Sequence, residues 1–102
     1  LEVQLRRAGI SRLVIVGFFT NFCVETTTRM AGNLGFDTYL VDDCCATTNR
    51  VGLDGIDREP ELVHAMTVAN LHGEFCTAVQ SNDALGLVAS DNVALSRCQG
   101  NE

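Results

Sequence analysis

Residues 13–16, with the sequence Leu-Val-Ile-Val, form an uninterrupted apolar run that is rich in β-branched side chains. Such a run is typical of a strand buried on both faces, as occurs in parallel sheets that helices cover on both sides. A helical stretch that ends at a glycine precedes it, over residues 1–9. An amphipathic helical pattern follows it, over residues 22–34. This change of period on either side of a buried run predicts an α/β fold.

The alternation of strand and helix signals continues along the chain. Residues 36–43 and 75–81 have strand character, and residues 61–73 and 82–89 have helical character. Units of this size predict an α/β fold in which a parallel sheet has helices on both faces. About three strands are few for such a sheet, so the pattern predicts about half of a larger domain.

Residues 90–102 differ from the rest of the chain because polar side chains dominate them. We expect them to form a loose polar C-terminal tail, outside a domain of residues 1–89. The strand at residues 13–16 would then be an exposed edge, at which the remaining strands of the larger sheet are missing.

The balance of charges limits the partners of the chain. Its 102 residues include 13 acidic and 7 basic ones, which gives a net charge of -6. A nucleic acid or an anionic membrane needs a basic surface, so we expect a small-molecule substrate and neither of those partners. The sequence has no recognisable secretory signal, and no apolar run approaches the roughly 20 residues of a transmembrane helix.

The five cysteines lack the C-x-x-C spacing that is typical of metal sites, and Cys44 and Cys45 are adjacent. A disulfide between neighbours strains the backbone, so we expect two reduced thiols there. The sequence as a whole indicates a cytoplasmic protein that needs no metal and no cofactor.

Cys23 lies where the second predicted helix begins, after the carboxyl end of the first predicted strand. Ligands of open α/β sheets bind at that end of the strands. The first N–H groups of a helix have no partner within the helix, so they can stabilise a thiolate or an oxyanion. Position alone leaves two interpretations open, a buried packing residue and a nucleophile.

The residues around Cys23 resemble the isochorismatase-like cysteine hydrolase family. That family has the pattern G-x-x-T-x-x-C-V, followed by a Thr, an Ala, a Gly-aromatic pair and a strand that ends in Asp-Ala. The matching residues are Gly17, Thr20, Cys23, Val24, Thr27, Ala31, Gly35, Phe36 and Asp43. Cys44 departs from the pattern, because the family usually has Ala after the Asp. The likeness covers about residues 1–88 and corresponds to the C-terminal half of the family's domain.

The resemblance implies a six-stranded parallel sheet in a Rossmann-like α/β/α sandwich. It also implies a specific site around Cys23. Cys23 would be the nucleophile, and the backbone N–H groups of Phe19 and Cys23 would form the oxyanion hole. The family also has a cis peptide bond just before the first of these residues, here between Phe18 and Phe19. The implied substrate is a small amide, carbamoyl or related compound, and the full-length protein is expected to be a homo-oligomer.

The resemblance further implies an Asp general base and a Lys from segments that this sequence does not include. All seven basic residues are Arg, so none can take the role of the Lys. We therefore expect these 102 residues to be inactive alone. A non-catalytic α/β module for binding or assembly is the alternative interpretation.

Side chains near Cys23 are candidates for lining a substrate site: Phe18, Thr20, Asn21 and Phe22. For the aromatic residues, packing in the core is an equally good interpretation.

Three other polar residues have a structural interpretation. Asp43, at the end of the second predicted strand, is expected to bond loop backbone N–H groups instead of acting as a base. His64 and His72 lie eight residues apart on one predicted helix, too far to share a metal ion. We expect them to be surface or interface histidines.

Overall fold

The structure is a computed structural model that describes residues 2–88 and 93–98. Helices and strands alternate along most of these residues, except that β2, β3 and β4 follow one another. A five-residue π-helical turn, η1, follows the first strand. In chain order the elements are α1 (Glu2–Arg7), β1 (Arg12–Phe18), η1 (Thr20–Val24), α2 (Glu25–Asn33), β2 (Asp37–Ala46), β3 (Arg50–Val51), β4 (Asp57–Arg58), α3 (Pro60–Leu71), β5 (Thr77–Val79), α4 (Ser81–Leu87) and β6 (Val93–Cys98).

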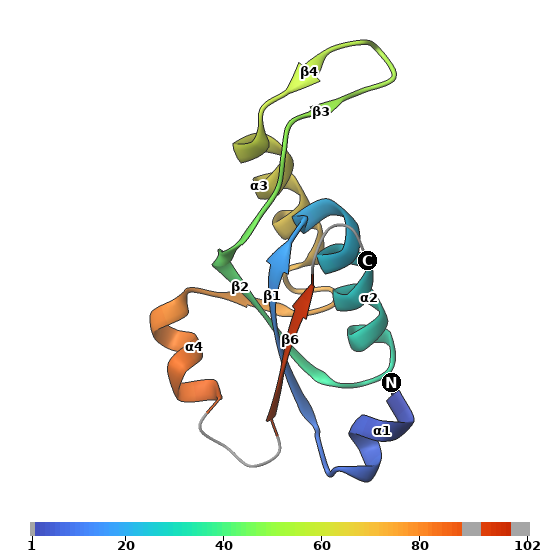
Figure 1. The fold of residues 1–102 in the computed structure, drawn as a ribbon, viewed down its shortest axis with the longest axis vertical. Coiled ribbons are helices and arrows are strands. Elements are labelled where there is room, and N and C mark those ends of the chain that lie inside the picture. The colour runs from blue at the N-terminus through green and yellow to red at the C-terminus, as the bar shows by residue number, and fades with distance from the viewer. Residues whose placement is uncertain (1, 89–92, 99–102) are drawn as a thin grey trace.

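Within the described residues, four strands form one sheet in the spatial order β5-β2-β1-β6, and all neighbouring pairs are parallel. β1 lies inside this sheet, where Ile15 pairs with Leu40 of β2 and with Ser96 of β6. Helices α2 and α4 lie on opposite sides of the sheet (Figure 1). This arrangement confirms the predicted parallel sheet with helices on both faces.

Alternate residues of β1 contribute to two separate parts of the core. Leu13 and Ile15 belong to a buried cluster that also contains Val24 of η1 and Leu71 of α3. Val14 belongs to a second buried cluster, with Val41 of β2 and Ala84 of α4. Both faces of β1 are therefore buried, as the uninterrupted apolar run predicts.

The prediction of a loose tail over residues 90–102 is wrong for Val93–Cys98, which form strand β6. β6 pairs with β1 from Arg12 to Gly17, so β1 is not the exposed edge that the sequence suggested. The apolar residues at the start of β6 pack against the core, Val93 at one cluster and Ala94 at the other. The remaining tail positions lie outside the described residues.

Between β2 and α3 the chain forms an antiparallel hairpin of β3 and β4. Figure 1 shows this hairpin projecting beyond α3, away from the sheet. An ion pair of 2.8 Å between Arg58 and Asp54 stabilises its turn.

None of the helices in residues 2–88 and 93–98 has the length and apolar character needed to cross a membrane.

Candidate active site

Cys23 lies on η1, directly after the carboxyl end of β1. Gly17 has a φ of 126°, a conformation that favours glycine, and the peptide bond between Phe18 and Phe19 is cis. The Phe19 carbonyl then accepts the N–H of Phe22 at 3.0 Å and that of Val24 at 3.4 Å. The second bond spans five residues and gives η1 its wide π-helical form.

The Cys23 side chain is half-buried and packs against the larger core cluster. Its neighbour Val24 is fully buried and belongs to that cluster. Phe19, the other residue of the implied oxyanion hole, is extended and immediately precedes η1. Phe19 thus immediately precedes η1 and Cys23 is its fourth residue, so both stand beside the end of β1, and both are partly accessible.

Aromatic side chains gather at the entrance to this turn. Phe18 and Phe22 are 46% and 42% exposed. The ring of Phe19 lies between them, with centroid distances of 5.5 Å to Phe18 and 6.3 Å to Phe22. The Arg50 guanidinium, from the projecting hairpin, lies 5.1 Å from the centroid of the Phe22 ring. The structure therefore brings together an exposed apolar surface and one positive charge.

The two polar candidates on η1 have different positions. Asn21 is half-buried, and its Oδ1 accepts a hydrogen bond of 2.6 Å from the Thr47 hydroxyl, which ties η1 to the segment after β2. Thr20 is fully buried, so its hydroxyl supports η1 from beneath instead of lining a substrate space.

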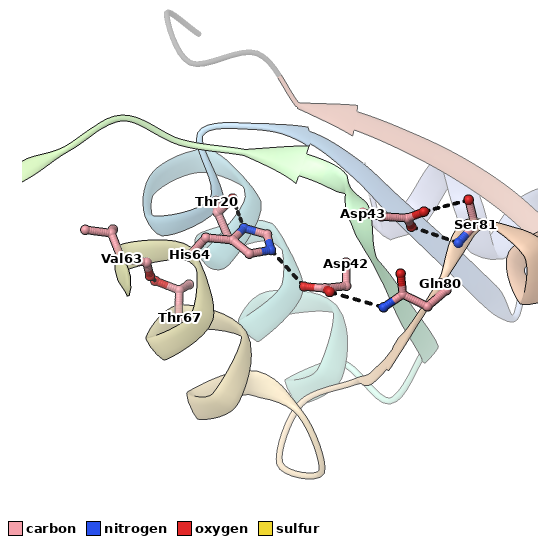
Figure 2. Close-up of polar contacts among 8 residues, drawn as sticks. All are labelled: Thr20, Asp42, Asp43, Val63, His64, Thr67, Gln80 and Ser81. Carbon is pink, nitrogen blue, oxygen red and sulfur yellow. Dashed lines mark hydrogen bonds and ion pairs between the residues drawn. The ribbon is translucent and has the colours of Figure 1, made fainter. Parts of the chain in front are cut away.

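His64 of α3 is the partner of Thr20, and sequence reasoning missed this role. The ring Nδ1 lies 2.9 Å from the Thr20 hydroxyl, and Nε2 lies 2.7 Å from Oδ1 of Asp42 (Figure 2). The His64 side chain is only 20% exposed, which corrects the expected surface histidine. A signal was present, because His64 shares a helix face with the inward residues Thr67 and Leu71.

The second histidine, His72, follows α3 as its C-cap residue and has a different environment. His72 is exposed, and its Nδ1 accepts the N–H of Ala78 at 2.9 Å. His72 also lines a groove of about 390 Å³ beside α3, together with Asp42, His64 and Gln80. Among residues 2–88 and 93–98, no group of three or more His, Cys, Asp or Glu side chains is arranged to hold a metal ion.

Asp42 and Asp43 are adjacent but bond to opposite sides of β2. They lie where the register between β1 and β2 shifts, between Ile15 and Gly17 of β1. Asp42 bonds to His64 of α3, whereas Asp43 accepts the N–H and the hydroxyl of Ser81 at the start of α4 (Figure 2). The hydrogen bond from the Ser81 hydroxyl is the main reason why the pKa of Asp43 lies below its usual value.

Comparison with known proteins relates this arrangement to one family. The model of the Isochorismatase domain matches residues 1–82. The crystal structure of an isochorismatase-family protein from Chromobacterium violaceum is similar, with a TM-score of 0.81 and 45% identity over 83% of this chain and 44% of that one.

Two curated proteins show the same relation. The isochorismatase family protein YrdC of Bacillus subtilis is 39% identical over 85 residues, which are 83% of this chain and 46% of YrdC. The ureidoacrylate amidohydrolase RutB of Agrobacterium fabrum is 32% identical over 89 residues, which are 87% of this chain and 35% of RutB. The chain therefore spans less than half the length of each relative. The match over residues 1–82 and the similar fold show that the chain belongs to the isochorismatase domain family.

Proposed function

We propose that this chain is the nucleophile-bearing part of a cysteine hydrolase that acts on a small amide, carbamoyl or related substrate. The observation that carries the proposal is the position of Cys23 on η1, at the carboxyl end of the central strand β1. The name of the relative RutB, an amidohydrolase, supports the amide class of substrate.

In the proposed reaction the Cys23 thiolate attacks the carbonyl carbon of the substrate, and the carbonyl oxygen becomes an oxyanion. The backbone N–H groups of Phe19 and Cys23 hold that oxyanion. The C–N bond then breaks, the amine leaves with a proton, and a thioester remains on Cys23. Water then attacks the thioester carbon, the C–S bond breaks, and the acyl group leaves as the acid while the Cys23 thiol is restored.

The acid–base groups of this reaction come, by the family resemblance, from segments outside this sequence. An Asp would take the proton of the thiol and later activate water, and a Lys would assist it. We therefore expect the 102 residues to be inactive alone. The homo-oligomeric state of the full-length protein also stays a prediction of the resemblance.

The aromatic residues at the entrance suggest how a substrate is held. Phe18 and Phe22 offer exposed apolar faces that suit a small planar compound. Arg50 adds a cation next to Phe22, which favours a substrate with an anionic or carbonyl group.

A non-catalytic module is the second candidate, because Cys23 also packs against the core cluster like a structural cysteine. Alkylation by iodoacetamide separates the two candidates, with the exposed Cys44 as an internal reference in the full-length protein. An activated nucleophile reacts faster at Cys23 than at Cys44 at pH 7. Equal or slower modification of Cys23 would contradict the hydrolase proposal.

Turnover provides the second test. With a panel of small amides and carbamoyl compounds, Cys23→Ala is expected to lower kcat by roughly three orders of magnitude or more. Cys44→Ala is the matched control and is expected to keep the wild-type rate.

A further inference from the structure

A chain of hydrogen bonds runs from the turn that carries Cys23 to the carboxyl end of β5. The Thr20 hydroxyl lies 2.9 Å from Nδ1 of His64, and Nε2 of His64 lies 2.7 Å from Oδ1 of Asp42. The other carboxylate oxygen of Asp42 accepts the side-chain amide of Gln80 at 3.2 Å. Figure 2 shows these side chains in a continuous line that joins η1, α3, β2 and the residue after β5.

The line of hydroxyl, imidazole and carboxylate has the components of a catalytic triad, but its environment excludes that role. Thr20 has no exposed surface, so its hydroxyl cannot reach a substrate. The hydrogen bonds therefore have a structural role: Asp42 orients the His64 ring, and the ring holds the Thr20 side chain in place.

The two hydrogen bonds of His64 determine which ring nitrogen donates and which accepts. An ionised Asp42 only accepts, so Nε2 of His64 carries a hydrogen and donates it. In the neutral ring Nδ1 then accepts the hydrogen of the Thr20 hydroxyl. Within the described residues every buried side-chain nitrogen and oxygen has a partner, and His64 supplies one to Thr20.

Turn η1 depends on such an anchor. Its two buried residues are Thr20 at one end and Val24 at the other, and Cys23 lies between them. Val24 is held by the apolar core, whereas the Thr20 side chain is held by its hydrogen bond to His64. The bond from the Val24 N–H to the Phe19 carbonyl, which spans the turn, is long at 3.4 Å and therefore weak.

We propose that His64 is a positioning residue for the Cys23 site, acting through the Thr20 hydroxyl. Loss of the bond leaves a buried hydroxyl without a partner, and η1 must move for Thr20 to find another. That movement changes the relation between Cys23 and the N–H groups that stabilise its thiolate. The inference rests on the proposed function, because it assigns His64 to the same nucleophile.

Two substitutions of His64 separate its two bonds. In His64→Asn the amide lies near the place of Nδ1, so it can reach Thr20 and not Asp42. In His64→Gln the amide lies near the place of Nε2, so it can reach Asp42 and not Thr20. If the contact with Thr20 matters, Asn rescues the site and Gln does not, although both remove the ring.

The test compares the rates at which iodoacetamide modifies Cys23 and Cys44 in the full-length protein at pH 7. His64→Gln and Thr20→Val are expected to lower the ratio of these rates on the order of tenfold, and His64→Asn is expected to keep it within about twofold of wild type. Thr67→Val is the matched control, because Thr67 is a buried residue of α3 whose hydroxyl bonds only the Val63 carbonyl of its own helix (Figure 2). It can lower the melting temperature but is expected to leave the ratio unchanged.

The outcomes distinguish this inference from the proposed function. A wild-type ratio near one contradicts the proposed nucleophile, and the inference fails with it. A high wild-type ratio that His64→Gln and Thr20→Val leave unchanged contradicts the role of His64 alone. The inference is also overturned if His64→Asn and His64→Gln lower the rate ratio equally and their melting temperatures fall by a corresponding amount. Such a result indicates a general effect on stability.

Discussion

The Asp43 carboxylate, in the second half of β2, is joined to Ser81, the first residue of α4, by two hydrogen bonds. The backbone N–H of Ser81 donates to one oxygen at 2.8 Å, and its hydroxyl donates to the other at 2.7 Å. Gln80, the residue at the N-cap position of α4, makes no capping hydrogen bond with its side chain. Asp43 therefore caps α4 from a neighbouring strand, near the positive end of the helix dipole.

The capping role of Asp43 predicts a pH dependence of stability. The hydrogen bonds from Ser81 lower the pKa of Asp43, so the ionised carboxylate stabilises the fold above its unfolded pKa of about 4. That contribution is lost as the pH falls through the lower pKa of the folded state. In urea unfolding, Asp43→Asn should therefore have a lower free energy of unfolding than wild type at pH 7. The difference between the two proteins should shrink as the pH falls below about 4.

Ser81→Ala is the companion variant for this measurement. It keeps the carboxylate and the backbone bond but removes the hydroxyl donor, so it should lose part of the pH dependence. A difference between wild type and Asp43→Asn that stays constant from pH 7 into the acid range would argue against the cap.

Gly32 of α2 is expected to resist substitution by Ala. A Cβ there would lie 2.5 Å from the carbonyl oxygen and 2.9 Å from the Cα of Phe75, whose backbone cannot move easily. Helix propensity favours Ala over Gly by about 1 kcal/mol, but the clash outweighs this gain. We expect Gly32→Ala to lower the free energy of unfolding by about 1–3 kcal/mol in urea titrations.

Gly86 of α4 provides the control, because a Cβ there meets nothing within 4 Å. Gly86→Ala should raise the free energy of unfolding by about 0.5–1 kcal/mol. If both variants change stability in the same direction, the close approach at Gly32 is not what decides its effect.

The sequence predicted those elements whose signals are local. The apolar run of β1 indicated a strand buried on both faces, and Leu13 and Val14 do face separate clusters. The helical character of residues 61–73 predicted α3, which begins one residue earlier, at Pro60. The fixed spacing around Cys23 indicated the family, to which the chain belongs.

Features that depend on several distant segments could not be predicted. β6 has only a short apolar stretch among polar neighbours, and its pairing with β1 depends on residues about 80 positions earlier. Thr20, His64 and Asp42 come from three elements, so no local pattern brings them together. Asp42 and Asp43 point to opposite faces of β2, as adjacent residues of a strand do, but the side chains that they meet there come from distant segments that no local pattern identifies.

Cys76 is expected to destabilise the fold at alkaline pH. It is buried in the larger core cluster, and burial raises the pKa of its thiol from 9.0 to about 11. Between these values the thiol ionises in the unfolded chain but stays protonated in the folded one, so unfolding becomes more favourable as the pH rises.

Urea midpoints of wild type and Cys76→Ala at pH 7 and pH 10.5 test this expectation. The cavity in Cys76→Ala lowers its stability at both pH values, but the difference from wild type should be smaller at alkaline pH. Cys44→Ala is the control for the loss of a thiol, because Cys44 is exposed and its truncation leaves the core intact. An unchanged difference for Cys76→Ala would show that its thiol does not titrate as burial requires.

β6 is expected to prevent the sheet from pairing with other chains as well as to stabilise it. It covers β1 from Arg12 to Gly17, and a chain that stops before Val93 leaves those backbone groups of β1 without their partner strand. An open edge of this kind pairs with another chain, so the truncated protein should unfold at lower urea and self-associate in light scattering. A chain that stops after Cys98 keeps β6 and is the matched control, and it is expected to have the stability and the association state of the 102-residue chain. Equal behaviour of the two truncated chains would mean that β6 contributes little to the sheet.

The substitution Ser96→Pro tests the same pairing without shortening the chain, because Ser96 lies opposite Ile15 of β1. It should reproduce the lower stability and the self-association of the longer truncation.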